Sequence, residues 1–314
     1  MKRGHLAFIG VSTGSSSILP VFPLWAERLG LEGATIVGHD LPLGATRAAY
    51  RATVRGLRDD DTCAGALITT HKVALFEAAR DLFADVGASA DLCGECSCLS
   101  KREGAGLVAT AKDPLAAAQA IGRFLPDGHF ESTDGHVLCL GAGGAATAIA
   151  VHLLTSGTPA RRPRRLILVD RDPARLEANR AIHRRLHTGG DVDYVLGDDA
   201  RVNDRLVGEL PPGSLVVNAT GMGKDSPGSP LTDGVSFPSR GLVWELNYRG
   251  ELRFLHQARE RERARSLTVV DGWDYFVFGW SAVIEEVYGL TLGDADIGDM
   301  AEIARRARRD SSAT

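Results

Sequence analysis

Apolar runs alternate with stretches of helical periodicity along the first third of the chain. Leu6–Val11 is a short apolar run that ends in the polar segment Ser12–Ser17, and the next stretch places Leu24, Trp25 and Leu29 at helical spacing. Further strands are predicted over 35–38, 65–69, 96–99 and 106–109, and further helices over 46–57, 73–83 and 115–124. Such alternation is typical of an open, mainly parallel sheet with helices on its faces.

A second series of alternating elements follows the linker-like stretch 126–135. Strands are predicted over 137–140, 165–170, 215–219 and 242–246, and helices over 145–154 and 173–186. This rhythm is typical of a Rossmann-type domain. Helical patterns over 277–289 and 300–309 end the chain. The sequence therefore predicts an α/β protein of two domains, one over 1–112 completed by 275–314, the other over 113–274.

Length and charge agree with two domains that bind a small molecule. The chain has 314 residues, and domains average roughly 150. The formal net charge is −4, which supplies no general attraction to nucleic acid or to anionic lipid. A small-molecule partner is expected, and neither a nucleic acid nor a membrane.

Cysteine usage and the N-terminus favour a cytoplasmic protein. Five cysteines are an odd number for a disulfide framework, so reduced thiols are expected. The apolar run that begins at Leu6 is shorter than the core of a signal peptide. Residues 137–154 have about the length of a membrane span, but their glycines and His152 favour a buried strand followed by a helix.

A glycine-rich loop between a strand and a helix predicts a dinucleotide site. The segment Gly141–Ala146 matches the pattern G-x-G-x-x-A. Gly141 permits a tight turn, Gly143 lets the backbone approach a pyrophosphate, and Ala146 lets helix and strand pack closely, so that the helix N-terminus faces the anion. The predicted coenzyme-binding residues here are Gly141, Ala142, Gly143, Gly144 and Ala145. The alternative is a turn in a doubly wound sheet that binds nothing.

The end of the next strand indicates which coenzyme is bound. Asp170 would accept hydrogen bonds from ribose hydroxyls and repel a 2′-phosphate, which favours NAD, whereas the neighbouring Arg171 would attract that phosphate and leaves NADP open. A small-residue turn after a later strand is expected near the nicotinamide, unless it is an ordinary strand-end turn. Its residues are Asn218, Ala219, Thr220, Gly221 and Met222.

Two polar residues at element edges could carry proton chemistry. Lys72 follows the strand predicted over 65–69, and Asp113 precedes the helix 115–124. Alcohol oxidation removes a hydroxyl proton as hydride leaves for nicotinamide, and a lysine oriented by a carboxylate suits this step. Taken alone, the two residues are more simply a solvated lysine and a helix cap.

The order of these pieces resembles the shikimate dehydrogenase family over nearly the whole chain. The loop Gly141–Ala146 and the segment Asn218–Thr220 are the specific matches. The resemblance implies that Lys72 and Asp113 are a hydrogen-bonded catalytic pair. It also implies a substrate-carboxylate site at Ser15 and Ser17, in a triple serine whose register is open by one residue. Tyr248 corresponds to the family's Tyr beyond the following strand and is expected at the substrate.

The departures from the family pattern fall on substrate contacts. The usual Asn-Val-Thr-x-Pro-x-Lys segment has Ile68 for the Thr and Thr70 for the Pro, which removes one ring-hydroxyl contact. Ser97 stands for an Asn and is expected to contact substrate in its place, and Gly279 stands for a Gln. Loss of hydroxyl-reading groups changes substrate discrimination strongly. We therefore expect the chemistry to persist and the substrate to differ.

Other signals compete with this interpretation. The spacing of Cys93, Cys96 and Cys98, with His71 as a fourth ligand, would suit zinc only poorly, and no metal is expected. His71 is equally consistent with a structural histidine and a proton carrier. The aromatic segment Trp273–Trp280 belongs either to the core or to a substrate pocket.

The sequence thus predicts an NAD(P)-dependent oxidoreductase that interconverts an alcohol and a ketone. The expected substrate is a cyclitol or cyclohexene carboxylate related to shikimate or quinate, NAD is the expected coenzyme, and a homodimer is left open. The alternative is a catalytically silent dinucleotide-binding regulatory protein on the same fold, because its hydroxyl-reading residues are altered.

Overall fold

The computed structural model describes residues 4–102, 104, 106–155, 162–186, 190–224 and 226–312. The chain divides into two compact units. Unit 1 is Met1–Asp113 with Val277–Thr314, and unit 2 is Pro114–Phe276. The chain therefore leaves unit 1 at residue 113 and re-enters it at residue 277.

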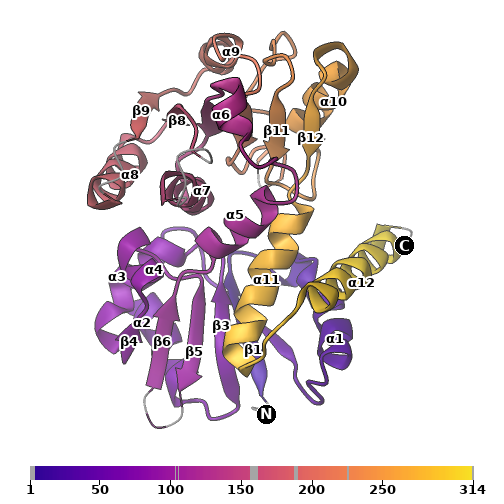
Figure 1. Ribbon diagram of the computed structural model, residues 1–314. Coiled ribbons are helices and arrows are strands. Elements are labelled where there is room, and N and C mark those ends of the chain that lie inside the picture. The colour runs from indigo at the N-terminus through magenta and orange to yellow at the C-terminus, as the bar shows by residue number, and fades with distance from the viewer. Residues whose placement is uncertain are drawn as a thin grey trace. The chain divides into compact units, whose positions relative to one another are not determined.

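Unit 1 is built on a mixed sheet. Its strands in the described residues are β1 (His5–Gly10), β2 (Ile36–Asp40), β3 (Cys63–Ile68), β4 (Asp85–Val86), β5 (Cys98–Arg102) and β6 (Gly106–Thr110), in the order β2-β1-β3-β5-β6-β4 (Figure 1). β1 is parallel to β2 and β3, and β4 is parallel to β6, whereas β5 is antiparallel to both of its neighbours. The predicted mainly parallel sheet is thus interrupted by the β5–β6 hairpin.

Helices from both ends of the chain complete unit 1. From the N-terminal part come η1 (Thr13–Ser15), α1 (Ile18–Arg28), α2 (Arg47–Asp59), α3 (Lys72–Ala79), η2 (Arg80–Leu82) and α4 (Ala88–Cys93); from the C-terminal part come most of α11 (Trp273–Tyr288) and α12 (Asp294–Ser312). The indole N–H of Trp25 donates to the carbonyl of Met300 at 2.8 Å, and the rings of Phe8 and Trp280 pack edge to face. The C-terminal helices are therefore part of this unit's core.

Unit 2 has the strand order of a Rossmann domain. Its parallel strands are β7 (Val137–Leu140), β8 (Arg165–Asp170), β9 (Asp191–Leu196), β10 (Leu215–Asn218), β11 (Leu242–Glu245) and β12 (Thr268–Val270), in the order β12-β11-β10-β7-β8-β9 (Figure 1). The chain reverses direction across the sheet between β7 and β10. Ligands bind at such a switch point, outside the carboxyl ends of the strands.

The connecting helices of unit 2 are α5 (Asp113–Ile121), α6 (His129–Thr133), α7 (Gly144–Thr155), α8 (Pro173–Leu186), α9 (Ala200–Gly208) and α10 (Arg253–Arg265). Leu138, Val216 and Val243, from three neighbouring strands, are buried in one apolar cluster with Phe237 and Phe254. This cluster fixes the strands whose ends carry the predicted coenzyme residues.

The structure corrects several sequence-based bounds. The strand predicted over 96–99 begins at Cys98, and the helix predicted over 73–83 breaks into α3 and η2. The strand β9 was not predicted, because aspartates alternate with apolar residues in it and it lies at the sheet edge, half exposed. Each described helix is too short or too polar to cross a lipid bilayer.

Candidate active site

Unit 1 brings Lys72 and Asp113 together. Lys72 is the first residue of α3, after the turn that follows β3, and Asp113 is the first residue of α5, three positions after the end of β6. The Nζ of Lys72 donates a hydrogen bond to Oδ2 of Asp113, with the Lys72 side chain 21% exposed and the Asp113 side chain 9% exposed. Two residues 41 positions apart thus form a largely buried ion pair.

The charge on Lys72 is set by two opposing effects. Burial lowers the pKa of Lys72, but the carboxylates of Asp113 and then of Glu95 raise it, and the net pKa lies above the ordinary lysine value. Lys72 is therefore an ammonium ion at neutral pH. It can donate a proton to an oxygen that gains negative charge.

Glu95 is a buried acid in the same place, and the sequence analysis did not single it out. It is 1% exposed, and neither of its carboxyl oxygens has a hydrogen-bond partner among the described residues. Burial, with the charge of Asp113, raises the pKa of Glu95 to about 7, although Lys72 lowers it. The only available sequence signal was a charged residue inside a run of small and apolar residues.

His71 holds the turn before α3. Its Nδ1 accepts from the Tyr50 hydroxyl at 2.9 Å, and its Nε2 donates to the carbonyl of Leu41 at 2.9 Å. Because both ring nitrogens are engaged with protein groups, His71 is a structural histidine. The described residues contain no cluster of three His, Cys, Asp or Glu side chains suited to a metal ion.

The predicted substrate contacts in unit 1 lie in different environments. Ser15 is exposed on η1 and its hydroxyl donates to the carbonyl of Ser12 at 3.2 Å, while Ser17 precedes α1 and is half-buried. Ser97 is 2% exposed, and its hydroxyl accepts the backbone N–H of Lys112 at 2.7 Å. The Ser97 hydroxyl therefore already supports the chain just before Asp113.

Ile68 and Gly279 mark the family positions that lack polar groups here. Ile68 is fully buried at the end of β3, so it offers no hydroxyl. A Cβ added at Gly279 on α11 would meet nothing within 4 Å. Position 279 therefore has room for a Cβ atom.

In unit 2, the glycine-rich loop passes over the sheet at the switch point. Gly141 has φ +104°, and a Cβ there would lie 2.8 Å from the carbonyl group of Ala219, so only glycine fits. A Cβ at Gly143 would meet nothing within 4 Å. Gly144 and Ala145 open helix α7, so the free N–H groups of its first turn are available to an anion.

Asp170 ties the strand β8 to this loop. Its Oδ2 accepts the N–H of Ala142 at 2.7 Å, and its Oδ1 accepts the N–H of Asp172 at 2.9 Å. The Asp170 side chain is 6% exposed, with a guanidinium nitrogen of Arg175 3.8 Å from it. Each oxygen keeps one lone pair for a further donor such as a ribose hydroxyl.

The turn after β10 is held by its own side chains. Asn218 is fully buried, donates to Oε2 of Glu245 at 2.8 Å, and accepts the N–H and hydroxyl of Thr220. The Asn247 amide donates to the carbonyls of Thr220 and Met222. Asn218 therefore shapes the turn, and the backbone of Ala219 to Met222 remains to face a ligand.

A cavity of about 450 Å³ connects these parts of unit 2. Its lining includes Gly141, Asp170, Arg171 and the turn Ala219–Met222. Two lining or supporting residues were not predicted. Asn203 on α9 is buried in the lining, and Asn179 on α8 donates to the carbonyl of Ala142 at 2.9 Å. A dinucleotide fits this cavity in its chemistry: a glycine-rich backbone, an acid for a ribose and open space before Gly143.

Tyr248 lies in an aromatic cluster in unit 2. Its ring is 4.6 Å from that of Phe276 and 5.8 Å from that of Trp273, measured between centroids. Tyr248 is half-buried, whereas Trp273 and Phe276 are buried. Within the segment 273–280, these rings belong to the packing, and Tyr248 is the partly accessible member of the cluster.

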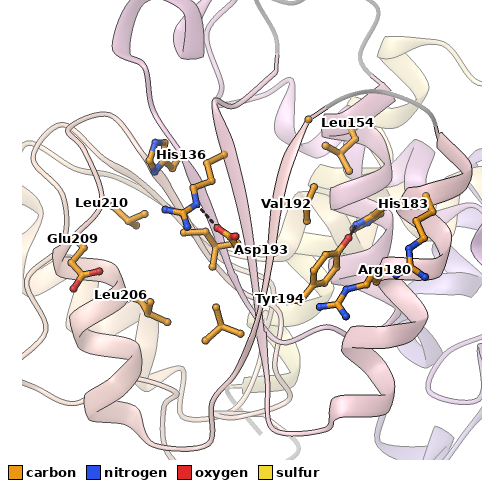
Figure 2. Close-up of a pocket in the computed structure, with 15 residues that line it drawn as sticks. His136, Leu154, Arg180, His183, Val192, Asp193, Tyr194, Leu206, Glu209 and Leu210 are labelled. Carbon is orange, nitrogen blue, oxygen red and sulfur yellow. Dashed lines mark hydrogen bonds and ion pairs between the residues drawn. The ribbon is translucent and has the colours of Figure 1, made fainter.

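A larger cavity, of about 860 Å³, lies at the edge strand β9 of unit 2 (Figure 2). None of the predicted site residues lines it. Several of its polar side chains interact with each other: Arg165 pairs with Asp193, His183 bonds the Tyr194 hydroxyl at 2.7 Å, and Arg180 lies over the Tyr194 ring. Its size therefore carries no indication of chemistry.

The chain is similar in sequence to curated proteins of known function. No family model matches the chain. A curated relative, shikimate dehydrogenase (NADP(+)) of Caulobacter vibrioides, is 26% identical over 267 residues, covering 84% of this chain and 82% of the relative. The enzyme of the same name from Streptococcus mutans is 24% identical over 297 residues, covering 93% and 94%.

Solved structures share the fold over nearly the whole chain. Shikimate 5-dehydrogenase of Thermus thermophilus, in complex with NADP(H) and shikimate, aligns with a TM-score of 0.68 at 24% identity, covering 97% of this chain and 99% of that one. Quinate dehydrogenase of Corynebacterium glutamicum with NAD aligns at 0.72 and 20%, covering 96% and 98%. The 5-ketofructose reductase of a Gluconobacter species aligns at 0.69 and 21%, covering 96% and 99%.

The mixed sheet of unit 1 and the Rossmann sheet of unit 2 define the fold of the NAD(P)-dependent oxidoreductases related to shikimate dehydrogenase. Over most of its length the chain is similar in sequence to shikimate dehydrogenases, and it shares their fold. The expected resemblance and the expected two-sheet α/β fold are thereby confirmed.

Proposed function

We propose that the protein is an NAD-dependent oxidoreductase that interconverts an alcohol and a ketone on a polyhydroxylated substrate, with Lys72 and Asp113 as the proton-transfer pair. The observation that carries this proposal is the buried hydrogen bond between the two side chains. The cavity of unit 2 supports it, because its lining suits a dinucleotide. The names of the relatives agree with it in reaction class.

The chemistry of Lys72 follows from its charge. In ketone reduction, the Nζ of Lys72 donates a proton to the carbonyl oxygen while hydride adds to the carbon, and Lys72 is left as a neutral amine. In alcohol oxidation, the neutral amine removes the hydroxyl proton. Asp113 orients Nζ and stabilises its charged form. A nicotinamide coenzyme, when bound, supplies or accepts the hydride.

The coenzyme would be held mainly by backbone groups. The loop at Gly141–Ala145 would take the pyrophosphate, and the turn Ala219–Met222 would lie along the nicotinamide side. Asp170 favours NAD, because its carboxylate accepts ribose hydroxyls and repels a 2′-phosphate. Arg171 and Arg175 line the same cavity and act in the opposite direction.

The substrate is proposed as a shikimate- or quinate-like ring, with Ser15, Ser17, Ser97 and Tyr248 as contacts. The altered positions Ile68 and Gly279 favour a hydroxyl pattern different from that of shikimate. Because a 5-ketofructose reductase shares the fold, 5-ketofructose is included in the panel of candidate substrates.

A coenzyme titration followed by a turnover screen tests the proposal. NAD, NADP and their reduced forms would be titrated calorimetrically, and the absorbance of reduced nicotinamide would then be followed with shikimate, quinate, their keto forms, aminated analogues and 5-ketofructose. Tight coenzyme binding with turnover of at least one substrate is expected. Coenzyme binding without turnover of any substrate would instead favour a coenzyme-responsive regulatory protein.

A further inference from the structure

Glu95 is a carboxylic acid that the proposed proton transfer leaves unused. The left-handed Gly94, with φ +64°, ends helix α4 and turns the chain, and the backbone N–H of Cys96 then approaches the carbonyl of Lys72 at 3.4 Å. The side chain of Glu95 is buried beside the Lys72–Asp113 pair and interacts electrostatically with both members. A buried carboxylate without hydrogen bonds is unfavourable for folding, so its presence calls for a function.

The groups that act on Glu95 are few. They are the ammonium of Lys72 on α3, the carboxylate of Asp113 on α5 and the neighbouring thiol of Cys96. Of these, Lys72 is the cation. An ionised Glu95 therefore gains its stabilisation from Lys72, and by reciprocity it stabilises the charged form of Lys72.

This coupling bears on the direction of the reaction. Burial favours the neutral amine of Lys72, and the two carboxylates oppose that effect. The neutral amine is the form that accepts a proton in alcohol oxidation, whereas the ammonium ion is the form that donates one in ketone reduction. A second carboxylate beside Lys72 therefore favours the reductive form of the site.

We propose that Glu95, once ionised, is a positioning residue that keeps Lys72 in its ammonium form and so biases the site toward ketone reduction. The bias toward reduction rests on the proposed function, whereas the effect on the charge of Lys72 does not. This separation lets the two be tested independently.

The charge of Lys72 can be measured by competitive acetylation of the full-length protein with acetic anhydride as a function of pH, read peptide by peptide by mass spectrometry. Below the pKa, the labelling rate follows the small fraction of neutral amine. The variants are Glu95→Gln, which removes the charge at constant shape, and Glu95→Leu, which also leaves no amide to satisfy. Asp113→Asn is the positive control, because Asp113 has the larger effect on Lys72.

The chain supplies a matched negative control in unit 1. Glu286 on α11 pairs with Lys112 at 2.5 Å and accepts hydrogen bonds from Ser100 and Thr110. Glu286→Gln should therefore leave the labelling of Lys72 unchanged.

With either Glu95 variant, the labelling rate of Lys72 at pH 8 should rise roughly tenfold, and that of Lys112 should not change. Equal Lys72 rates in the wild type and both variants would overturn the inference. So would a wild-type Lys72 that titrates below the ordinary lysine pKa, a result that needs no variant to fold. In steady-state assays at pH 8, Glu95→Gln should lower the ratio of kcat for ketone reduction to kcat for alcohol oxidation several-fold.

The failure of the proposed function has a different signature. Full turnover by Lys72→Met would contradict the proposed function, irrespective of the results for the Glu95 variants. An inactive Lys72→Met, together with an unchanged Lys72 labelling rate in both Glu95 variants, would leave the proposed function in place and remove only the role of Glu95.

Discussion

Each unit buries one glutamate among the described residues, and the two glutamates are held in opposite ways. In unit 2, Glu245 accepts hydrogen bonds from Asn218 and from the N–H of Asn247, so the acid is part of the support for the turn after β10. In unit 1, Glu95 has no hydrogen-bond partner and lies beside the charged pair Lys72 and Asp113. The buried glutamate of unit 2 is thus hydrogen-bonded into the fold, whereas that of unit 1 interacts with neighbouring charges.

This difference indicates a division of labour. Backbone groups and shape recognise a ligand whose form is constant, such as a pyrophosphate, and need only small residues at fixed positions. Proton transfer and substrate choice depend on side chains, which can change while the backbone stays the same.

The largest expected effect is on proton transfer by the side chain of Lys72. Lys72→Met should lower turnover about 10³-fold, because the proton donor is lost, while the dissociation constant of the coenzyme changes less than about twofold. Steady-state kinetics and calorimetry would measure the two quantities. Lys101→Met, which removes a lysine bonded to the carbonyl of Asp60 in the same unit, is the matched control. Equal losses in both variants would contradict the assignment.

Substitution of two glycines in the loop of unit 2 should have different consequences for coenzyme binding and for stability. Gly143→Ala should weaken coenzyme binding about 100-fold at an unchanged melting temperature, because the added Cβ meets no protein atom within 4 Å and occupies the approach to the loop. Gly141→Ala should instead lower the free energy of unfolding by about 2–4 kcal/mol, since its φ is positive and its Cβ would touch Ala219. The reverse pattern of effects would refute this account of the loop.

The acid of unit 2 should appear in the pH dependence of stability. Burial raises the pKa of Glu245 to about 7, so between about pH 4.5 and 7 the folded state keeps a proton that the unfolded chain releases. The free energy of unfolding should therefore fall as pH rises through this range, and Glu245→Gln should remove about 2–3 kcal/mol of that fall. Denaturant unfolding at several pH values measures it. Glu251→Gln, at an exposed glutamate, should leave the profile as in the wild type.

The smallest expected effect is on coenzyme choice. Asp170→Asn should lower the ratio of NAD to NADP affinity about tenfold, because the repulsion of a 2′-phosphate is lost while Arg171 and Arg175 remain. Asp198→Asn changes a second acid in the lining of the same cavity and serves as the control. An unchanged ratio in Asp170→Asn would remove Asp170 from the determinants of coenzyme choice.

The sequence predicted the loop and the turn of unit 2 better than it predicted the contacts made by buried side chains. The loop at Gly141 and the turn at Asn218 are local patterns of small residues, so they could be recognised from sequence alone. The role of Asn218 as the support of its turn depends on Glu245, which is 27 positions away and is not visible in any local pattern.

In unit 1, the resemblance to the shikimate dehydrogenase family predicted Lys72 and Asp113 as partners, and their side chains are hydrogen-bonded. Their surroundings, however, depend on tertiary packing. Glu95 gave a weak signal because nothing local shows that a glutamate between Gly94 and Cys96 is buried. His71 was left undecided because its two partners, Tyr50 and Leu41, are 21 and 30 residues away. The strand β9 was not predicted for a simpler reason, because an edge strand with alternating aspartates resembles a loop in sequence.

The most direct test of the division between the units is a single turnover with reduced NAD that carries deuterium at the transferred position. The wild-type protein should place one deuterium on the carbinol carbon of its product, and Lys72→Met should bind the labelled coenzyme as tightly but transfer no measurable deuterium in the same time. Deuterium transfer by Lys72→Met at the wild-type rate, or a large loss of its coenzyme affinity, would contradict the account.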